Sequence, residues 1–289
     1  MNQKYAVVYN RSLESIFGEQ ARAVTRELDC VCLYTDEIQF LADDEITFEK
    51  CVYFDKDVIT GLRLELLGVR LYNNIGAIEL CDDKRRCTEL LRRDLNVPET
   101  VYAPLWFDDN EALRKEFATK VGDRLGFPLI GKLAFGSLGQ QVRLISCREQ
   151  LIQVCEEWKH QPYLFQKYVA SSKGKDLRIY VVDGKAVAAM ERYNPDDFRS
   201  NIGAGGHGTK VTPSKEFEQA AIDACSLLGL DFGGVDLLYG EAGEPVICEV
   251  NSNALFRELN IVCGVQVEQY IADAVKSEPT PFDLSAFGF

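Results

Sequence analysis

The sequence predicts a protein that mixes α-helices with β-strands and opens with a small parallel α/β domain. Short apolar strands alternate with helical patterns over residues 1–75, as in chains built from βαβ units. Further along, apolar runs flank glycine-containing turns, which is typical of hairpins. The chain has 289 residues, 46% hydrophobic and 27% charged, so it can bury the cores of two or three lobes.

The elements of the first domain follow one another closely. Strands are predicted at residues 5–9, 31–34, 51–54 and 69–72, and helices at residues 13–28 and 58–67. No glycine-rich phosphate loop follows these strands, so we expect a structural or substrate-facing role for the domain. Residues 73–78 are expected to be a connection, and a helix is predicted from Asp82 to Asp94.

Two lysines in the next segment suit an anionic ligand. Lys84 lies early in the predicted helix and is followed by two arginines, although such a cluster is usually a solvated face. Lys132 lies on an apolar strand that leads into a loop with glycines on both sides of Ser137. Backbone N–H groups of such a loop can approach phosphate oxygens. The alternative is a plain hairpin with a glycine turn.

Two glycine motifs do not indicate a nucleotide site. Residues 126–132 match Gly-x-x-x-x-Gly-Lys, but Leu133 replaces the Ser or Thr of a P-loop and the interior is apolar strand. Residues 203–208 match Gly-x-Gly-x-x-Gly, but they do not open a helix after a strand. A mobile loop near a ligand suits residues 202–209 better.

A second hairpin is predicted at residues 174–192, around Asp183 and Gly184, after a strand at 163–168 that ends in a hinge. Asp176 and Arg178 share a face of this hairpin by alternation, and they can be a pair on the sheet surface. Helices are predicted from Thr212 to about residue 228 and at about 265–274.

A third hairpin holds the acids on which the functional prediction depends. Apolar runs at 235–239 and 246–250 flank the polar segment 240–244. If the turn is centred between residues 242 and 243, Asp236 lies opposite Glu249, and Asn251 shares the face of Glu249. Facing carboxylates repel unless a cation lies between them, and oxygen ligands favour Mg²⁺. The alternative is an edge hairpin whose acids face solvent.

Charge and cysteine usage exclude several classes of protein. The net charge of −13 argues against general binding to nucleic acids or anionic membranes. The ten cysteines are scattered and form no Cys-x-x-Cys pair, so we expect reduced thiols in a cytoplasmic protein. The first residues lack the apolar run of a signal peptide, and no stretch approaches the ~20 apolar residues of a membrane span.

Taken in order over residues 69–275, these motifs resemble the RimK-like branch of the ATP-grasp ligases. The resemblance is carried by Asp83-Lys84, Lys132 with Gly136-Ser137, Gln166-Lys167-Tyr168, Asp176-Leu177-Arg178, Phe198-Arg199-Ser200-Asn201, Gly234-Val235-Asp236 and Glu249-Val250-Asn251. It implies an ATP-grasp fold of two α+β lobes that enclose ATP, after the N-terminal parallel α/β domain. The implied divisions are an N-terminal domain at 1–75, a central lobe at 76–165, a C-terminal lobe with the metal site at 166–276, and a tail at 277–289.

The resemblance also implies roles for individual residues. Those expected to contact the nucleotide are Lys84, Lys132, Ser137, Gln166, Lys167, Tyr168, Asp176, Arg199, Ser200 and Asn201. Those expected to grip the transferred phosphoryl group and the acyl phosphate are Arg178, Arg199 and Asn201. The expected ligands of Mg²⁺, or of Mn²⁺ in its place, are Asp236, Glu249 and Asn251.

The implied activity is ATP- and Mg²⁺-dependent joining of a carboxylate to an amine through an acyl phosphate. Such an enzyme adds an amino acid such as glutamate to a small molecule, a peptide or a protein tail, and relatives commonly form homo-oligomers. Two alternatives stay open, an ATP-binding module without ligation and a phosphotransferase that forms an acyl phosphate. Two departures from the family pattern, Lys167 at the hinge and residues 252–256 in place of a Pro-Gly turn, leave the acceptor undetermined.

Overall fold

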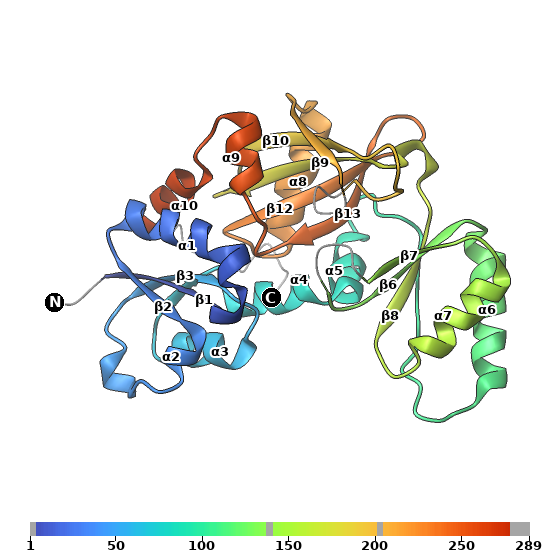
Figure 1. The fold of residues 1–289 in the computed structure, drawn as a ribbon, viewed down its shortest axis with the longest axis horizontal. Helices are drawn as coiled ribbons and strands as arrows, with labels where there is room; N and C mark the ends of the chain where they lie inside the picture. Colours follow the sequence, from blue (N-terminus) through green and yellow to red (C-terminus); the bar gives the residue numbers. More distant parts are fainter. Residues whose placement is uncertain (1–3, 137–140, 201–204, 278–289) are drawn as a thin grey trace. The chain divides into compact units, whose positions relative to one another are not determined.

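The computed structural model describes residues 4–136, 141–200 and 205–277. They form two compact units, shown within the ribbon of Figure 1. One unit comprises the chain up to Tyr72 together with the residues from Gln266 onward, and the other runs from Asn73 to Val265. Within these described residues, no helix is long and apolar enough to cross a membrane.

The first unit is the predicted parallel α/β domain. Its parallel strands, in the order β2-β1-β3-β4, are β1 (Tyr5–Tyr9), β2 (Val31–Tyr34), β3 (Lys50–Phe54) and β4 (Arg70–Tyr72). Its helices are η1 (Arg11–Leu13), α1 (Glu14–Leu28), α2 (Thr35–Ile38), η2 (Asp43–Glu45), α3 (Val58–Leu66) and α10 (Val267–Lys276). Helix α10 packs beside α1, so a helix from the far end of the chain completes this unit.

The second unit contains two antiparallel sheets. The sheet ordered β5-β8-β6-β7 consists of β5 (Thr100–Tyr102), β6 (Leu129–Leu133), β7 (Val142–Ile145) and β8 (Tyr163–Lys167). The sheet ordered β11-β10-β9-β12-β13 consists of β9 (Lys175–Val182), β10 (Lys185–Tyr193), β11 (His207–Lys210), β12 (Phe232–Tyr239) and β13 (Pro245–Asn251). The helices of this unit are α4 (Ile75–Asp82), α5 (Lys84–Leu91), α6 (Glu111–Leu125), α7 (Arg148–Glu157), η3 (Ala170–Ser172), α8 (Lys215–Leu227) and α9 (Arg257–Cys263).

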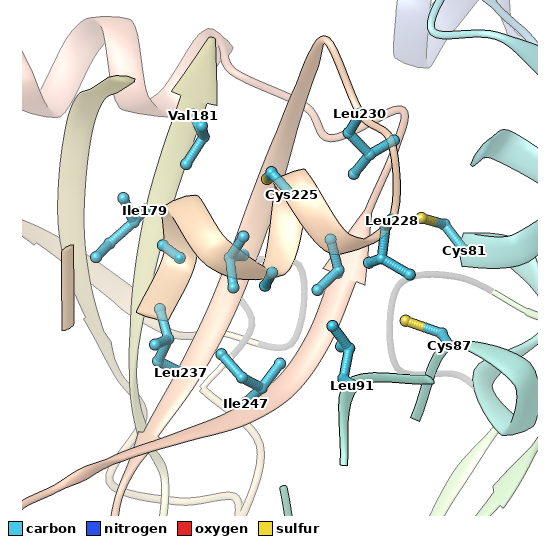
Figure 2. Close-up of a cluster of buried hydrophobic side chains, with 14 of the residues drawn as sticks. Cys81, Cys87, Leu91, Ile179, Val181, Cys225, Leu228, Leu230, Leu237 and Ile247 are labelled. Carbon is cyan, nitrogen blue, oxygen red and sulfur yellow. The ribbon is translucent and has the colours of Figure 1, made fainter. Parts of the chain in front are cut away.

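Each of these sheets buries one face under helices. Helices α6 and α7 share a core with the smaller sheet. Helix α8 covers the larger sheet, and Figure 2 shows its Cys225 in the same cluster as Ile179 of β9 and Leu237 of β12. Alternate residues of a strand face opposite sides, so Asp176 and Arg178 of β9 and Asp236 of β12 point away from α8. This polar face lines the candidate site.

Several predicted boundaries are wrong. The helix predicted from Thr212 begins later, because Ser214 caps α8, which starts at Lys215. Residues 73–78 are not simply a connection, because helix α4 begins at Ile75, where Asn74 Oδ1 accepts a 2.9 Å bond from the Ala77 amide. The helix predicted at 82–94 is shorter, because Asp83 caps the separate helix α5 through the Arg85 amide. Residues 207–210, expected in a loop, form β11 against β10.

Candidate functional site

A cavity lies between the two antiparallel sheets of the second unit. Ten residues predicted to bind nucleotide or metal line it, namely Lys84, Lys132, Gln166, Lys167, Tyr168, Asp176, Arg199, Ser200, Asp236 and Glu249. Arg178 and Asn251 are not among the lining residues, and Ser137 and Asn201 lie outside the described residues. Segments from Lys84 to Glu249 are therefore gathered around one space.

The charged lining of this cavity is cationic in an acidic protein. The cations are Lys84, Lys132, Lys167, Lys175, Arg192 and Arg199. They outnumber the three lining carboxylates of Asp176, Asp236 and Glu249, although the whole chain carries a net charge of −13. A concave surface with this excess of positive charge attracts anions.

Asp236 is the most enclosed acid of the site, with only 3% of its surface exposed. It lies directly opposite Arg178 across β12 and β9, and Arg178 Nε and Nη2 each donate to one of its carboxylate oxygens at 2.7 Å. Burial opposes ionisation of Asp236, but the charges of Arg178 and Arg192 outweigh burial and hold its pKa well below the usual value. Asp236 is thus a buried carboxylate that remains ionised.

Arg192 links two acids of the site. It lies opposite Asp176 across β10 and β9, and its guanidinium forms a bidentate pair with that carboxylate, with Nε 2.7 Å from Oδ1. Its Nη2 is also 3.0 Å from Asp236 Oδ2. The pairing of Asp176 with Arg178 suggested by their shared face is wrong, because each residue pairs across the sheet instead.

Glu249 lies opposite Asp236, as the hairpin pattern predicts. The residues between this pair and the turn are paired in a different register from the predicted one. Nearer the turn, Leu237 pairs with Ile247, so Cys248 is an extra residue that forms a β-bulge. Glu249 also lies 3.3 Å from Lys84 Nζ, which donates to the Gly136 carbonyl at 2.7 Å. Within the described residues, no three His, Cys, Asp or Glu side chains form a group that could hold a metal ion.

Lys132 is buried against the bulge. Its side chain extends from β6, and Nζ is 3.4 Å from the carbonyl oxygen and 3.8 Å from Sγ of Cys248. Only 7% of Lys132 is exposed, so the ammonium charge is directed into the cavity rather than into bulk solvent. The same surroundings raise the pKa of the Cys248 thiol, because its burial outweighs the charge of Lys132.

The hinge residues form a mixed polar and apolar end of the cavity. Gln166 is buried and donates to Thr100 Oγ1 at 3.2 Å. The Lys167 amide donates to the Glu99 carbonyl at 2.8 Å, so this N–H belongs to the sheet edge. The apolar residues that line the cavity are Pro98, Ile130, Val142, Val169, Phe198 and Leu238. Together these residues make the apolar part of the cavity next to the hinge residues.

Arg199 enters the cavity from the segment after β10. Its Nε and Nη2 bond to the carboxylate of Asp197 at 3.1 and 2.7 Å, and the Arg199 amide donates to the same carboxylate at 2.9 Å. Hydrogen bonding to Arg199 lowers the pKa of Asp197, although burial opposes it. Ser200, which follows, is buried and lines the cavity.

Sequence reasoning missed two of the charged residues in this lining. Lys175 and Arg192 lie near the two ends of the predicted hairpin at 174–192, but neither belongs to a recognised motif. A two-residue turn at 183–184 would place Glu191 opposite Asp176. The structure shifts the register between Ala186 and Ala188 and puts Arg192 there instead. The only signal available was the hairpin itself, and the bulge changes its register.

A family model described as a RimK-like ATP-grasp domain matches residues 81–275, about two thirds of the chain. The chain belongs to the RimK-like ATP-grasp family. Among curated RimK-like relatives, beta-citrylglutamate synthase B of Danio rerio is 34% identical over 229 residues, which cover 78% of this chain and 55% of that protein. N-acetylaspartylglutamate synthase A of Homo sapiens is 34% identical over 231 residues, covering 78% and 57%. This chain therefore spans little more than half the length of these two relatives.

Other proteins to which this chain is similar are covered more fully. A probable alpha-L-glutamate ligase of Maridesulfovibrio salexigens is 31% identical over 223 residues, covering 76% of this chain and 71% of that protein. Among solved structures, the ATP-grasp ligase PsnB complexed with a minimal precursor aligns with a TM-score of 0.72 at 20% identity, over 95% of this chain and 99% of that one. D-alanine–D-alanine ligase from Bacillus anthracis complexed with ATP aligns with a TM-score of 0.71 at 18% identity, over 94% and 96%. The predicted ATP-grasp fold is confirmed.

Proposed function

We propose that this chain is an ATP- and Mg²⁺-dependent carboxylate–amine ligase that forms an amide bond through an acyl phosphate. The observation that carries the proposal is the cationic cavity between the two sheets, in which the facing acids Asp236 and Glu249 lie beside Lys84 and Lys132. A polyanion that brings a divalent cation matches this combination of many cations and two facing carboxylates. Membership of the RimK-like ATP-grasp family supports ATP as that polyanion.

The cavity offers separate surroundings for the parts of ATP. The apolar lining next to the hinge suits adenine. The Lys167 amide is already bonded to the Glu99 carbonyl, so we propose that adenine is recognised through the backbone near Tyr168 and Val169. Asp176 is proposed to accept from the ribose. Lys84 and Lys132 are proposed to contact the phosphates, together with Ser137, which lies outside the described residues. Arg199, Ser200 and Asn201 are proposed to contact the phosphoryl group.

The donors of the site fit a hard divalent cation. Asp236 and Glu249 face each other across β12 and β13, and Asn251 is the last residue of β13. All three are proposed as ligands, because Mg²⁺ prefers oxygen atoms. Two guanidinium groups now neutralise Asp236, which shows that this acid needs positive charge close to it. A bound divalent cation would supply charge stabilisation at the phosphates and would orient them.

The side chains present can carry out acyl phosphate chemistry without a nucleophilic residue. Attack of a substrate carboxylate on the γ-phosphate brings two anions together, so Lys84, Lys132, Arg178 and Arg199 are proposed to offset the repulsion. That attack forms the acyl phosphate and releases ADP. An amine then attacks the acyl carbon, phosphate leaves, and loss of a proton from the amine nitrogen gives the amide. Water must be excluded during this interval, because it would hydrolyse the acyl phosphate.

Glutamate is the amine donor that we propose to test first. Curated relatives include a beta-citrylglutamate synthase, an N-acetylaspartylglutamate synthase and a probable alpha-L-glutamate ligase, and all three names contain glutamate. The acceptor carboxylate belongs to a small molecule, a peptide or a protein tail. The acidic net charge of this chain favours an acceptor of small or modest charge.

The deciding experiment measures ADP release from ATP and Mg²⁺ with pools of carboxylates and amino acids, and analyses the same mixtures by mass spectrometry. We expect ADP release that requires both a carboxylate and an amine, and a product whose mass is their sum less one water. ADP release without an amide product would favour a phosphotransferase. Tight ATP binding without turnover in pools that also include peptides and protein tails would favour a binding module and contradict the ligase.

A further inference from the structure

We infer that Arg192 is a positioning residue that couples binding of the nucleotide to binding of the divalent cation. This inference rests on the proposed nucleotide and metal site and adds a residue that lies outside the motifs of that site. Arg192 is 3% exposed, lines the cavity, and contacts both Asp176 and Asp236. Those two acids are the proposed ribose and metal ligands.

The position of Arg192 follows from the order of the strands. Strand β10 is separated from β12 by β9, so a side chain on β10 must cross the whole width of β9 to reach Asp236. Arginine is long enough, and its planar fork can bond one carboxylate through two nitrogens while an outer nitrogen contacts a second. The bulge between Ala186 and Ala188 sets the register that places Arg192 opposite Asp176.

The charges of this cluster balance within the protein. Asp176 and Asp236 contribute two negative charges, and Arg178 and Arg192 contribute two positive charges, all four side chains being largely buried. A cation that approached Asp236 would therefore meet a carboxylate whose two oxygens already accept from guanidinium groups. The affinity of the site for the cation is lowered for two reasons. The attraction between Asp236 and the arginines is weakened when the cation binds, and the two arginines repel the cation.

Phosphate oxygens in the cavity would change this balance. Arginine forms strong bidentate bonds with phosphate, so Arg192 has an alternative anionic partner once a nucleotide is bound. When Arg192 turns part of its fork towards phosphate, Asp236 Oδ2 keeps only its bond from Arg178 Nη2 and gains room to coordinate the cation. Nucleotide and cation thus favour each other's binding, and the coupling acts equally in both directions.

Mn²⁺ provides a probe of this coupling that does not require turnover. Free Mn²⁺ is measured by electron paramagnetic resonance in titrations of the full chain, with and without a non-hydrolysable ATP analogue. In Arg192→Met, which removes the charge and keeps much of the volume, we expect Mn²⁺ without nucleotide to bind at least about fivefold more tightly than in the wild type. We also expect the gain in Mn²⁺ affinity caused by the analogue to shrink by at least the same factor.

A matched control separates this effect from the general loss of a buried arginine. Arg114 is 2% exposed and pairs with Glu156 at 2.8 Å and Asp109 at 3.5 Å, and it does not line the cavity. Arg114→Met should leave both Mn²⁺ affinities at wild-type values. A purely structural role for Arg192 predicts weaker Mn²⁺ binding, which is the opposite direction.

The inference is overturned if Arg192→Met binds Mn²⁺ alone no more tightly than the wild type, or if Arg114→Met shows the same change. Circular dichroism verifies that each variant folds. If Arg192→Met does not fold, the Mn²⁺ affinities of Arg192→Lys test the coupling instead. A single ammonium cannot hold both acids as a fork does, so Arg192→Lys should change both affinities in the same direction by a smaller factor. Wild-type values in Arg192→Lys would overturn the coupling. A wild type that binds neither ATP nor its Mn²⁺ complex would instead contradict the proposed function.

Discussion

Asp236 and Glu249 face each other across β12 and β13 because one extra residue, Cys248, bulges out of β13 between them and the turn. In a regular strand Cys248 would face the side opposite to Glu249. The bulge instead lets both residues line the cavity, and Lys132 Nζ lies close to the Cys248 carbonyl. This short segment therefore brings together the acids and the lysine of the proposed site.

Glu249→Gln should remove metal-dependent activity with little effect on the fold. The Glu249 side chain is 30% exposed and its ion pair with Lys84 is 3.3 Å long, so we expect the free energy of unfolding to change by less than about 1 kcal/mol. Loss of a charged ligand should lower the rate of ADP release by at least about 100-fold. Glu241→Gln, an exposed change in the turn of the same hairpin, is the control. Unchanged ADP release in Glu249→Gln would remove this acid from the metal site.

Lys132→Met should weaken ATP binding by about 10- to 100-fold, because the proposed charge-assisted bond from this buried lysine to phosphate is lost while the side-chain volume is kept. Isothermal titration calorimetry measures the dissociation constant. Lys120→Met serves as the control, since Lys120 is 73% exposed and pairs only with Glu116 in the described structure. Equal ATP affinity in the wild type and Lys132→Met would assign Lys132 to the fold alone.

Asp236 should stabilise the fold in a pH-dependent manner. Its pKa is lowered in the folded protein, since Arg178 and Arg192 outweigh its burial, so its contribution is complete above the unfolded pKa near 3.9 and is lost as pH falls below it. At neutral pH we expect Asp236→Asn to lower the free energy of unfolding by about 3–5 kcal/mol. Urea titrations should give a constant difference between about pH 8 and pH 5 and a smaller one below about pH 4. A difference that declines already between pH 8 and pH 6 would contradict this account.

Cys248 should react slowly with iodoacetamide and should be protected by nucleotide. Burial raises the pKa of its thiol, so little thiolate is present at neutral pH and the reaction should accelerate as pH rises. Cys248 lines the cavity, so ATP at about 100 times its dissociation constant should slow labelling by up to about 100-fold. Peptide mass spectrometry measures this, with the partly exposed Cys147 outside the cavity as internal control. An equal rate of Cys248 labelling with and without ATP would indicate that ATP binds outside this cavity.

Gly234→Ala should disturb the segment that follows the proposed metal ligands. A Cβ at Gly234 would lie 2.5 Å from Cβ of Ala254, whose carbonyl accepts from Tyr180 Oη at 3.3 Å. We expect the substitution to lower the free energy of unfolding by about 1–3 kcal/mol. Ala254→Gly in the same chain should restore part of that loss, because it removes the clashing methyl group. Additive effects in this double-mutant cycle would show that the two sites do not touch.

Much of the fold was determined by the sequence alone. Apolar alternation and glycine turns located the strands of the first domain and the three hairpins, since these signals depend on neighbouring residues only. Helix α4 was missed because its short apolar segment follows two asparagines, which read equally well as a turn and as a helix cap. The spaced motifs also indicated most of the residues that line the cavity.

The tertiary structure decided which charged side chains meet. Alternation places Asp176 and Arg178 on one face, but their partners are Arg192 and Asp236 on the two neighbouring strands. The one-residue shift in β10 sets the contact of Arg192 with Asp176, and the shift in β13 brings Glu249 opposite Asp236. A shift of one residue exchanges the faces of a strand. The contact of Arg178 with Asp236 joins β9 to β12, two strands that are distant along the chain. The sequence therefore determined the positions of the charged residues, whereas the ion pairs between them were settled only when the sheet formed.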